Sequence, residues 1–257
     1  MKTKSICVVG NSHISALKGG WDLIKDEHPQ QQVTFFGGLK KSLMNLDNID
    51  GKLGLHNAED AEFFKKISGT DDFLNPDQYD VFLLTGMGLY PNAIINNYWN
   101  YATPSTKNSV SAEYFISDEA YADMFWQEVS EGMMLHVARI IRKVTKKNIY
   151  ISWQPFLSEQ LFQIPWRAKL FEPILINDDY VFIHHNMQII SQKLKDEGFD
   201  VLMQPAESIF KKIMTKKCYS TGSMLLRPEF NQEHKELDVF HMNAEYGRLC
   251  WQMWDLR

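Results

Sequence analysis

Short apolar runs that alternate with helix-length segments are the feature that most constrains how this chain folds. Residues 81–84 are consecutive apolar residues, and residues 5–9 are nearly so, which is typical of strands buried on both faces of a parallel sheet. Strands that alternate with helices form layered α/β folds. We therefore expect a three-layer α/β/α sandwich with a mostly parallel sheet of about five strands. The expected strands are 5–9, 33–36, 81–84, 148–153 and 200–203, and the expected helices are 12–25, 118–146, 179–197 and 244–254.

The length of the chain favours a single domain. Its 257 residues, 44% of them hydrophobic, suit one α/β domain with insertions or at most two small domains. We find no internal repeat, low-complexity run or linker, so we predict one domain over residues 1–257. Residues 39–77 and 157–176 are expected to be mostly irregular. Residues 90–117, which are rich in Tyr, Trp and Asn, are a candidate lid insertion.

Charge and hydropathy exclude several classes of partner. The net charge is −5 and no basic stripe is present, so nucleic acid is not an expected partner. The apolar run after Lys2 and Lys4 is too short for a signal peptide. No stretch reaches the roughly 20 apolar residues of a membrane span. The sequence thus predicts a cytoplasmic protein without a membrane span.

The cysteine and histidine pattern indicates neither a disulfide framework nor a metal centre. The three cysteines are sparse and odd in number, which fits a reducing compartment. Cys7 lies in an apolar run and is expected to pack there. No cluster has the ligand spacing of a zinc site, and the adjacent rings of His184 and His185 would diverge in regular structure. We expect no metal and no cofactor.

A serine follows the first expected strand, in the run Gly10-Asn11-Ser12-His13. A serine between a strand and a helix often caps the first turn of that helix. The same position also exposes its hydroxyl beside free backbone N–H groups and the positive end of the helix dipole, which stabilise an oxyanion. The motif alone leaves both interpretations open.

Near the other end of the chain, Asp238 and His241 are spaced so that they can meet on one turn. If the fold brings the two ends together, Ser12, His241 and Asp238 form a nucleophile, a base and an orienting carboxylate. The alternatives are that Asp238 caps a turn and that His241 is a surface residue.

These motifs resemble those of the SGNH/GDSL hydrolase family. Gly10-Asn11-Ser12 is similar to the family's first block, and Asp238-x-x-His241, followed by Tyr246-Gly247, is similar to its last. The resemblance implies a flavodoxin-like α/β/α fold with Ser12 as nucleophile, His241 as base and Asp238 as its partner. It also implies a serine esterase or acyltransferase.

The resemblance further implies an oxyanion hole built from the backbone of Ser12 and of a glycine after the second strand. Gly38 is the expected donor, although a slip of one or two residues would give the role to Leu39 or Lys40, and the Gly37-Gly38 pair could simply form a turn.

The family's third oxyanion donor is an Asn after the third strand, but this chain has Gly86-Met87-Gly88-Leu89 there, and Asn92 is out of register. We expect the Gly88 backbone to replace it, or a slow enzyme, since losing one donor costs on the order of 100- to 1000-fold in rate.

The resemblance favours an esterase that removes a small acyl group, such as acetyl, from a carbohydrate. One alternative is an O-acyltransferase acting on a polysaccharide or its precursor, and another is a catalytically weak domain that binds a glycan or a protein. Tyr98 and Trp99 are candidate sugar-stacking residues, whereas the alternative is that they only pack their loop onto the domain. The expected partner is a small-molecule or carbohydrate ester, and the oligomeric state is left open.

Overall fold

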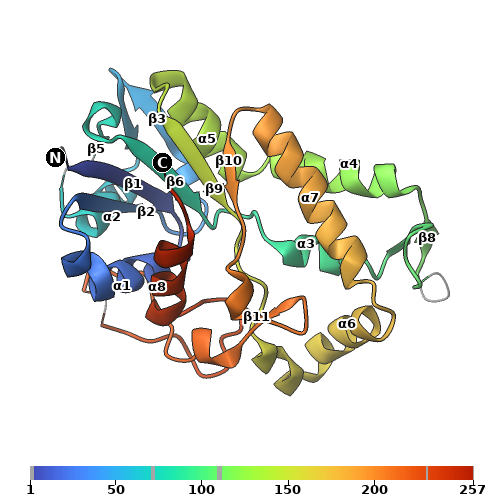
Figure 1. Ribbon diagram of the computed structural model, residues 1–257. Coiled ribbons are helices and arrows are strands. Elements are labelled where there is room, and N and C mark those ends of the chain that lie inside the picture. Colours follow the sequence, from blue (N-terminus) through green and yellow to red (C-terminus); the bar gives the residue numbers. More distant parts are fainter. Residues whose placement is uncertain (1–2, 71–72, 109–111, 230, 257) are drawn as a thin grey trace.

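A five-stranded parallel sheet organises the molecule in the computed structural model, which describes residues 3–70, 73–108, 112–229 and 231–256 (Figure 1). Every neighbouring pair of strands runs parallel, in the order β10-β9-β6-β1-β2. The fold class expected from the sequence is therefore confirmed. The strands are β1 (Lys4–Gly10), β2 (Gln31–Gly37), β6 (Val81–Thr85), β9 (Asn148–Ser152) and β10 (Asp200–Leu202).

This strand order is that of a flavodoxin-like sheet, in which the chain reverses its direction of winding between the first strand and its neighbour. Here the reversal lies between β1 and β6. Gly10 at the end of β1 is level with Gly37 on β2 and with Thr85 on β6. The loops that follow these three strands therefore leave one edge of the sheet together, where sites in such folds are found.

Helices cover both faces of the sheet. Ile6 and Val8 of β1 pack in one hydrophobic cluster with α1 (Ile14–Ile24) and α8 (Ala244–Met253). Cys7 and Val9 face the opposite way, because side chains alternate along a strand. They pack in a second cluster with α5 (Met133–Val144) and α7 (Tyr180–Asp196). Cys7 is fully buried in β1, as expected, and all three cysteines are free.

One expected long helix is in fact two. The segment 118–146 contains α4 (Asp118–Ser130) and α5, which are separated at Glu131 and Gly132. Gly132 has an extended backbone with φ −77° and ψ 166° and stands at the N-cap of α5. Glycine is a poor helix former, so the chain turns there although its apolar pattern continues across the break.

Residues 39–77 are more regular than the sequence suggested. They contain a small antiparallel sheet of β3 (Leu46–Ile49), β4 (Lys52–Leu55) and β5 (Phe73–Leu74), together with α2 (Ala58–Ser68). The turn between β3 and β4 is Asp50-Gly51, and both residues have positive φ. An Asp-Gly pair with this backbone is typical of a tight hairpin.

Two other segments also contain helices. Residues 157–176 include α6 (Pro165–Ile176), which begins at a proline, and residues 90–117 include α3 (Pro91–Asn97) with the short pair β7 (Tyr101–Ala102) and β8 (Tyr114–Phe115). Residues 109–111 of the second segment lie outside the described residues. Ile94 and Tyr98 are fully buried in the main core, so the lid at 90–117 stays a prediction that this packing does not favour.

The remaining pair of strands, β11 (Ile209–Phe210) and β12 (Met214–Thr215), is antiparallel. Within the described ranges, no helix combines the length and the hydropathy that crossing a bilayer requires.

The two ends of the chain meet where α1 packs against α8, side by side in Figure 1. Two glycines permit the close approach: a Cβ atom at Gly20 would overlap the backbone of Arg248, and one at Gly247 would overlap the carbonyl of Ala16. The Trp251 indole also donates to the Leu17 carbonyl at 2.8 Å. This crossing places the residues that precede α1 beside those that precede α8.

Candidate active site

Ser12 lies in the tight turn between β1 and α1, at the edge of the sheet where the winding reverses. Its Oγ atom is 2.9 Å from Nε2 of His241, 229 residues away in sequence. The N-cap residue of α1 is His13, and no side chain caps that helix. The hydroxyl of Ser12 is thus directed at a histidine rather than at the first turn of its own helix.

Asp238 holds the other nitrogen of the His241 ring. His241 Nδ1 lies 3.0 Å from Asp238 Oδ2 and 3.2 Å from Oδ1. Asp238 Oδ1 also accepts hydrogen bonds from the backbone N–H groups of Phe240 and His241, at 2.8 and 2.9 Å. The carboxylate therefore caps the turn and orients the imidazole at the same time.

The turn that carries His241 is anchored by the residue that begins α8. Asn243 caps this helix by accepting from the Tyr246 N–H at 3.1 Å. Its amide nitrogen donates to the carbonyls of Cys218 and Thr221, both at 2.8 Å. One side chain therefore joins the helix, the turn and the loop that precedes them.

The carboxyl of Asp238 is held in its charged form. Burial on its own would raise the pKa, but hydrogen bonds from His234 and His241 outweigh this effect and hold the pKa well below the usual range. A permanently ionised Asp238 is a strong acceptor for an imidazole N–H.

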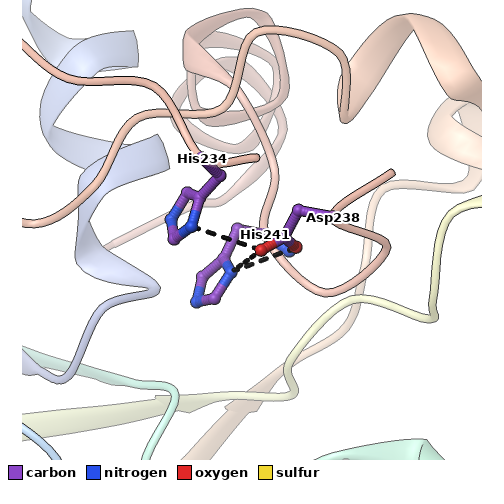
Figure 2. Close-up of side chains that lie close together, drawn as sticks. All are labelled: His234, Asp238 and His241. Atoms are coloured by element: carbon purple, nitrogen blue, oxygen red, sulfur yellow. Dashed lines mark hydrogen bonds and ion pairs between the residues drawn. The ribbon is translucent and has the colours of Figure 1, made fainter. Parts of the chain in front are cut away.

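Sequence analysis missed His234, which Figure 2 shows beside Asp238 and His241. Its Nδ1 lies 3.2 Å from Asp238 Oδ2, and its ring stacks on that of His241 with centroids 3.9 Å apart and planes 9° apart. Its Nε2 atom is buried without a partner among the described residues. The only local clue was its place four residues before Asp238.

A third imidazole, that of His13, stacks on His241 with ring centroids 4.8 Å apart. Burial, followed by the nearby His241, lowers the pKa of His13 to about 3. The His13 ring is therefore neutral at ordinary pH and adds no positive charge beside His241.

The expected oxyanion donors differ in whether their backbone N–H groups already make a hydrogen bond. The N–H of Gly38 already donates to the Gly10 carbonyl at 3.0 Å, so the assignment of Gly38 is wrong. In the described parts of the chain, the N–H groups of Ser12, Leu39 and Gly88 make no hydrogen bond. Gly88 is exposed in a loop, with φ 91°. Ser12, Gly88 and the neighbour Leu39 remain available as donors.

The predicted sugar-stacking pair does not present two free rings. Tyr98 is fully buried, and its hydroxyl donates to Asp179 at 2.7 Å. Because neither face of its ring is open, the assignment of Tyr98 is wrong. The Trp99 indole is half-buried and donates to the Leu170 carbonyl of α6 at 3.2 Å. Tyr98 therefore packs its segment onto the domain, which was the alternative, whereas a substrate role for Trp99 stays a prediction.

Two cavities border residues of the candidate site. One, of about 450 Å³, is lined mostly by apolar side chains and includes Gly88 and Met87 in its wall. The other, of about 590 Å³, includes Asp238, His234 and Phe240 together with Arg167 and Trp166 of α6. Exposed aromatic surface is found in the second cavity, where Trp166 is 58% and Phe240 41% exposed.

His234, Asp238 and His241 also have the geometry of a metal-binding group. One ligand atom from each residue lies within 4.8 Å of the others. Two imidazoles and a carboxylate form a donor set that zinc accepts. A metal bound here would replace the hydrogen bonds that orient His241, and those bonds account for the observed distances without an ion.

No family model and no curated protein matches this chain. Among solved structures, it is similar to a carbohydrate acetylesterase family member from Sinorhizobium meliloti (10% identity, TM-score 0.39, 97% of this chain and 94% of that one). It is also similar to a GDSL-like lipase from Bacteroides thetaiotaomicron (10% identity, TM-score 0.39, 97% of this chain and 85% of that one). A lipase from a goat rumen metagenome is similar as well (11% identity, TM-score 0.37, 84% of this chain and 91% of that one).

Proposed function

We propose that this protein is a serine esterase in which Ser12 is the nucleophile, His241 the base and Asp238 the residue that orients the base. The observation that carries the proposal is the chain of contacts from Ser12 Oγ to His241 Nε2 at 2.9 Å and from His241 Nδ1 to Asp238 Oδ2 at 3.0 Å. Nucleophile, base and orienting carboxylate at these distances are the parts of an acyl-transfer site.

In the proposed reaction, Ser12 Oγ attacks the ester carbonyl while His241 Nε2 takes the hydroxyl proton. The ionised Asp238 keeps the other ring nitrogen protonated and stabilises the imidazolium that forms. His241 then passes the proton to the leaving alcohol, and the acyl group stays on Ser12. Water, deprotonated by His241, attacks this acyl-enzyme and releases the acid, which restores the serine.

The oxyanion of each tetrahedral intermediate needs preorganised donors. The Ser12 N–H and the N–H of either Gly88 or Leu39 are the candidates, because none of the three makes a hydrogen bond within the described residues. No Asn side chain replaces the third donor in register. We therefore expect turnover below that of an enzyme with three donors.

The proposed substrate carries a small acyl group, with an acetylated carbohydrate as the expected class. The resemblance supports this choice, and the exposed rings of Trp166 and Phe240 beside Asp238 offer flat apolar surface of the kind that sugar faces contact. If a sugar hydroxyl rather than water accepts the acyl group, the same residues perform a transfer.

The test is hydrolysis of p-nitrophenyl acetate by the wild type and by His241→Ala and Asp238→Asn. We expect each substitution to lower kcat by about 10⁴-fold, as loss of the base or of its correct tautomer does elsewhere. The matched controls are His56→Ala and Asp47→Asn, which disrupt an exposed His–Asp pair at 3.3 Å and should leave turnover unchanged.

Turnover by His241→Ala within threefold of the wild type would overturn the proposal. Adding methyl glucoside to the reaction separates the two fates of the acyl group, because transfer yields an acetylated glucoside and hydrolysis yields acetate alone.

A further inference from the structure

We propose that Arg167 binds an anionic group of the substrate, a carboxylate or a phosphate, in the cavity beside Asp238. This inference rests on the proposed function and names its substrate class, an acylated acidic sugar. The cavity has a volume of about 590 Å³ and is lined by Arg167, Trp166 and Phe240 together with Asp238 and His234 of the candidate site.

The Arg167 guanidinium lies over two aromatic rings. Its Cζ atom lies 4.2 Å from the centroid of the Trp166 ring and 4.6 Å from that of Phe240. Contacts with two ring faces fix a planar cation in position. The side chain is thus pre-organised, which lowers the entropy lost when it binds a ligand.

The hydrogen-bonding capacity of this guanidinium is unused. In the part of the chain that the structure describes, no hydrogen bond or ion pair joins it to an acceptor. Burial lowers the pKa of Arg167, and the nearby charge of Asp238 opposes that change. A half-buried, unpaired guanidinium has a fork of N–H donors that matches a carboxylate or phosphate in two parallel hydrogen bonds.

Other charges around the cavity are less firmly placed. Glu233, Lys235 and Glu236 line it as well, and all three are exposed. These two carboxylates and one ammonium leave a single net negative charge, which water and salt screen because all three groups are exposed. The carboxylate of Asp238 is engaged by His234 and His241. Arg167 is therefore the cation best placed to select an anion.

The position of Arg167 relates the bound anion to the ester bond. Phe240, which contacts the guanidinium, directly precedes His241. A sugar whose acidic group binds Arg167 would lie along Trp166 and Phe240, next to the turn that carries the proposed base. This arrangement selects esters in which the acyl group and the anion belong to the same or adjacent sugar units.

The experiment compares three esters: O-acetylated methyl glucuronoside, O-acetylated methyl glucoside 6-phosphate and O-acetylated methyl glucoside. For the wild type, we expect kcat/KM to be at least about tenfold higher for one charged ester than for the neutral one, the scale of a charge-assisted hydrogen bond. The charged ester that the enzyme prefers identifies the bound anion as a carboxylate or a phosphate. In Arg167→Gln, the ratio of charged to neutral kcat/KM should fall to about one.

Two further variants sharpen the comparison. Arg167→Lys keeps the charge but not the fork and should retain part of the preference. Lys235→Gln removes an exposed cation from the same cavity and should leave the preference intact. Equal kcat/KM for all three esters in the wild type, or an unchanged preference in Arg167→Gln, would overturn the inference.

Failure of the proposed function would look different. In that case none of the esters, p-nitrophenyl acetate included, would be hydrolysed. Calorimetric titration with glucuronate and with glucose 6-phosphate would then test Arg167 by itself: binding that weakens at least about tenfold in Arg167→Gln supports the subsite, and no binding to the wild type refutes it.

Discussion

Gly247 of α8 lies directly against the backbone carbonyl of Ala16 in α1, so closely that a Cβ atom at position 247 would overlap that oxygen. Ser12 precedes α1 and His241 precedes α8, so the spacing of these helices determines whether the hydroxyl and the imidazole meet. A packing contact between two helices thus controls a hydrogen bond of 2.9 Å between side chains 229 residues apart.

Replacing Gly247 by Ala should therefore affect both stability and activity. The added methyl group forces α8 away from α1, and overpacking of this kind costs about 1–3 kcal/mol. We expect a lower urea midpoint and a fall in kcat that persists at temperatures where the variant is fully folded. The control is Gln252→Ala, an exposed position on the same helix. Wild-type stability and turnover in Gly247→Ala would contradict the proposed role of this crossing.

His234 is expected to act as a positioning residue through Asp238. The His234→Phe variant retains a flat ring against His241 but loses the N–H that lies 3.2 Å from Asp238 Oδ2. We expect kcat to fall about tenfold with little change in KM, since a hydrogen bond to a charged group is lost. His234→Gln, which can still donate, should recover part of the rate. Equal rates for the two variants would show that the hydrogen bond has no such role.

The His13 imidazole should make the folded state sensitive to mild acid. Its pKa is about 3 in the folded protein and about 6.5 in an unfolded chain. Below pH 6.5 the unfolded state therefore binds a proton that the folded state does not. The free energy of unfolding should consequently fall by up to about 1.4 kcal/mol per pH unit as the pH drops from 6.5 toward 4.5.

Urea denaturation across this window measures the effect. Asp238, whose pKa is lowered on folding, stabilises the fold above the unfolded pKa of about 3.9 and loses that contribution only at lower pH. The His13→Asn variant should therefore show a shallower slope between pH 6.5 and 4.5, whereas His56→Ala, at an exposed position, should not. Parallel slopes in wild type and His13→Asn would be evidence against a neutral His13 in the folded protein.

Metal ions should inhibit the protein rather than activate it. A zinc ion bound by His234, Asp238 and His241 would occupy the nitrogen that must hold the proton facing Asp238. We expect EDTA to leave hydrolysis of p-nitrophenyl acetate unchanged and added Zn²⁺ to slow it. His234→Ala, which removes one ligand, should be less sensitive to zinc. Loss of activity in EDTA, restored by zinc, would instead indicate a metal-dependent enzyme.

The central sheet was predictable from the sequence because its strands are local apolar runs. Residues 5–9 and 81–84 lie within β1 and β6, and burial on both faces makes such runs continuous. The break between α4 and α5 was missed, since the apolar pattern continues across Gly132. The Asp50-Gly51 pair of the hairpin turn is a local signal in the sequence, although the mixed, polar composition of residues 39–77 predicts mostly irregular structure.

The candidate site was predictable only where its residues form recognisable motifs. Ser12, Asp238 and His241 belong to such motifs, and the structure brings them into contact. The stack of His234 on His241 depends on how a long loop returns to the site, which spacing does not reveal. The burial of Tyr98 is a tertiary property, so its aromatic neighbourhood in the sequence was misleading.

The most direct test of the account is labelling with a fluorophosphonate, which reacts with activated serines. The wild type and Ser12→Ala would be treated in parallel, and the modified peptide would be identified by mass spectrometry. The account predicts one adduct on Ser12 in the wild type, none in the variant, and loss of p-nitrophenyl acetate hydrolysis with it. A folded wild type that is neither labelled nor active, or an adduct on another serine, would contradict the assignment of Ser12 as the nucleophile.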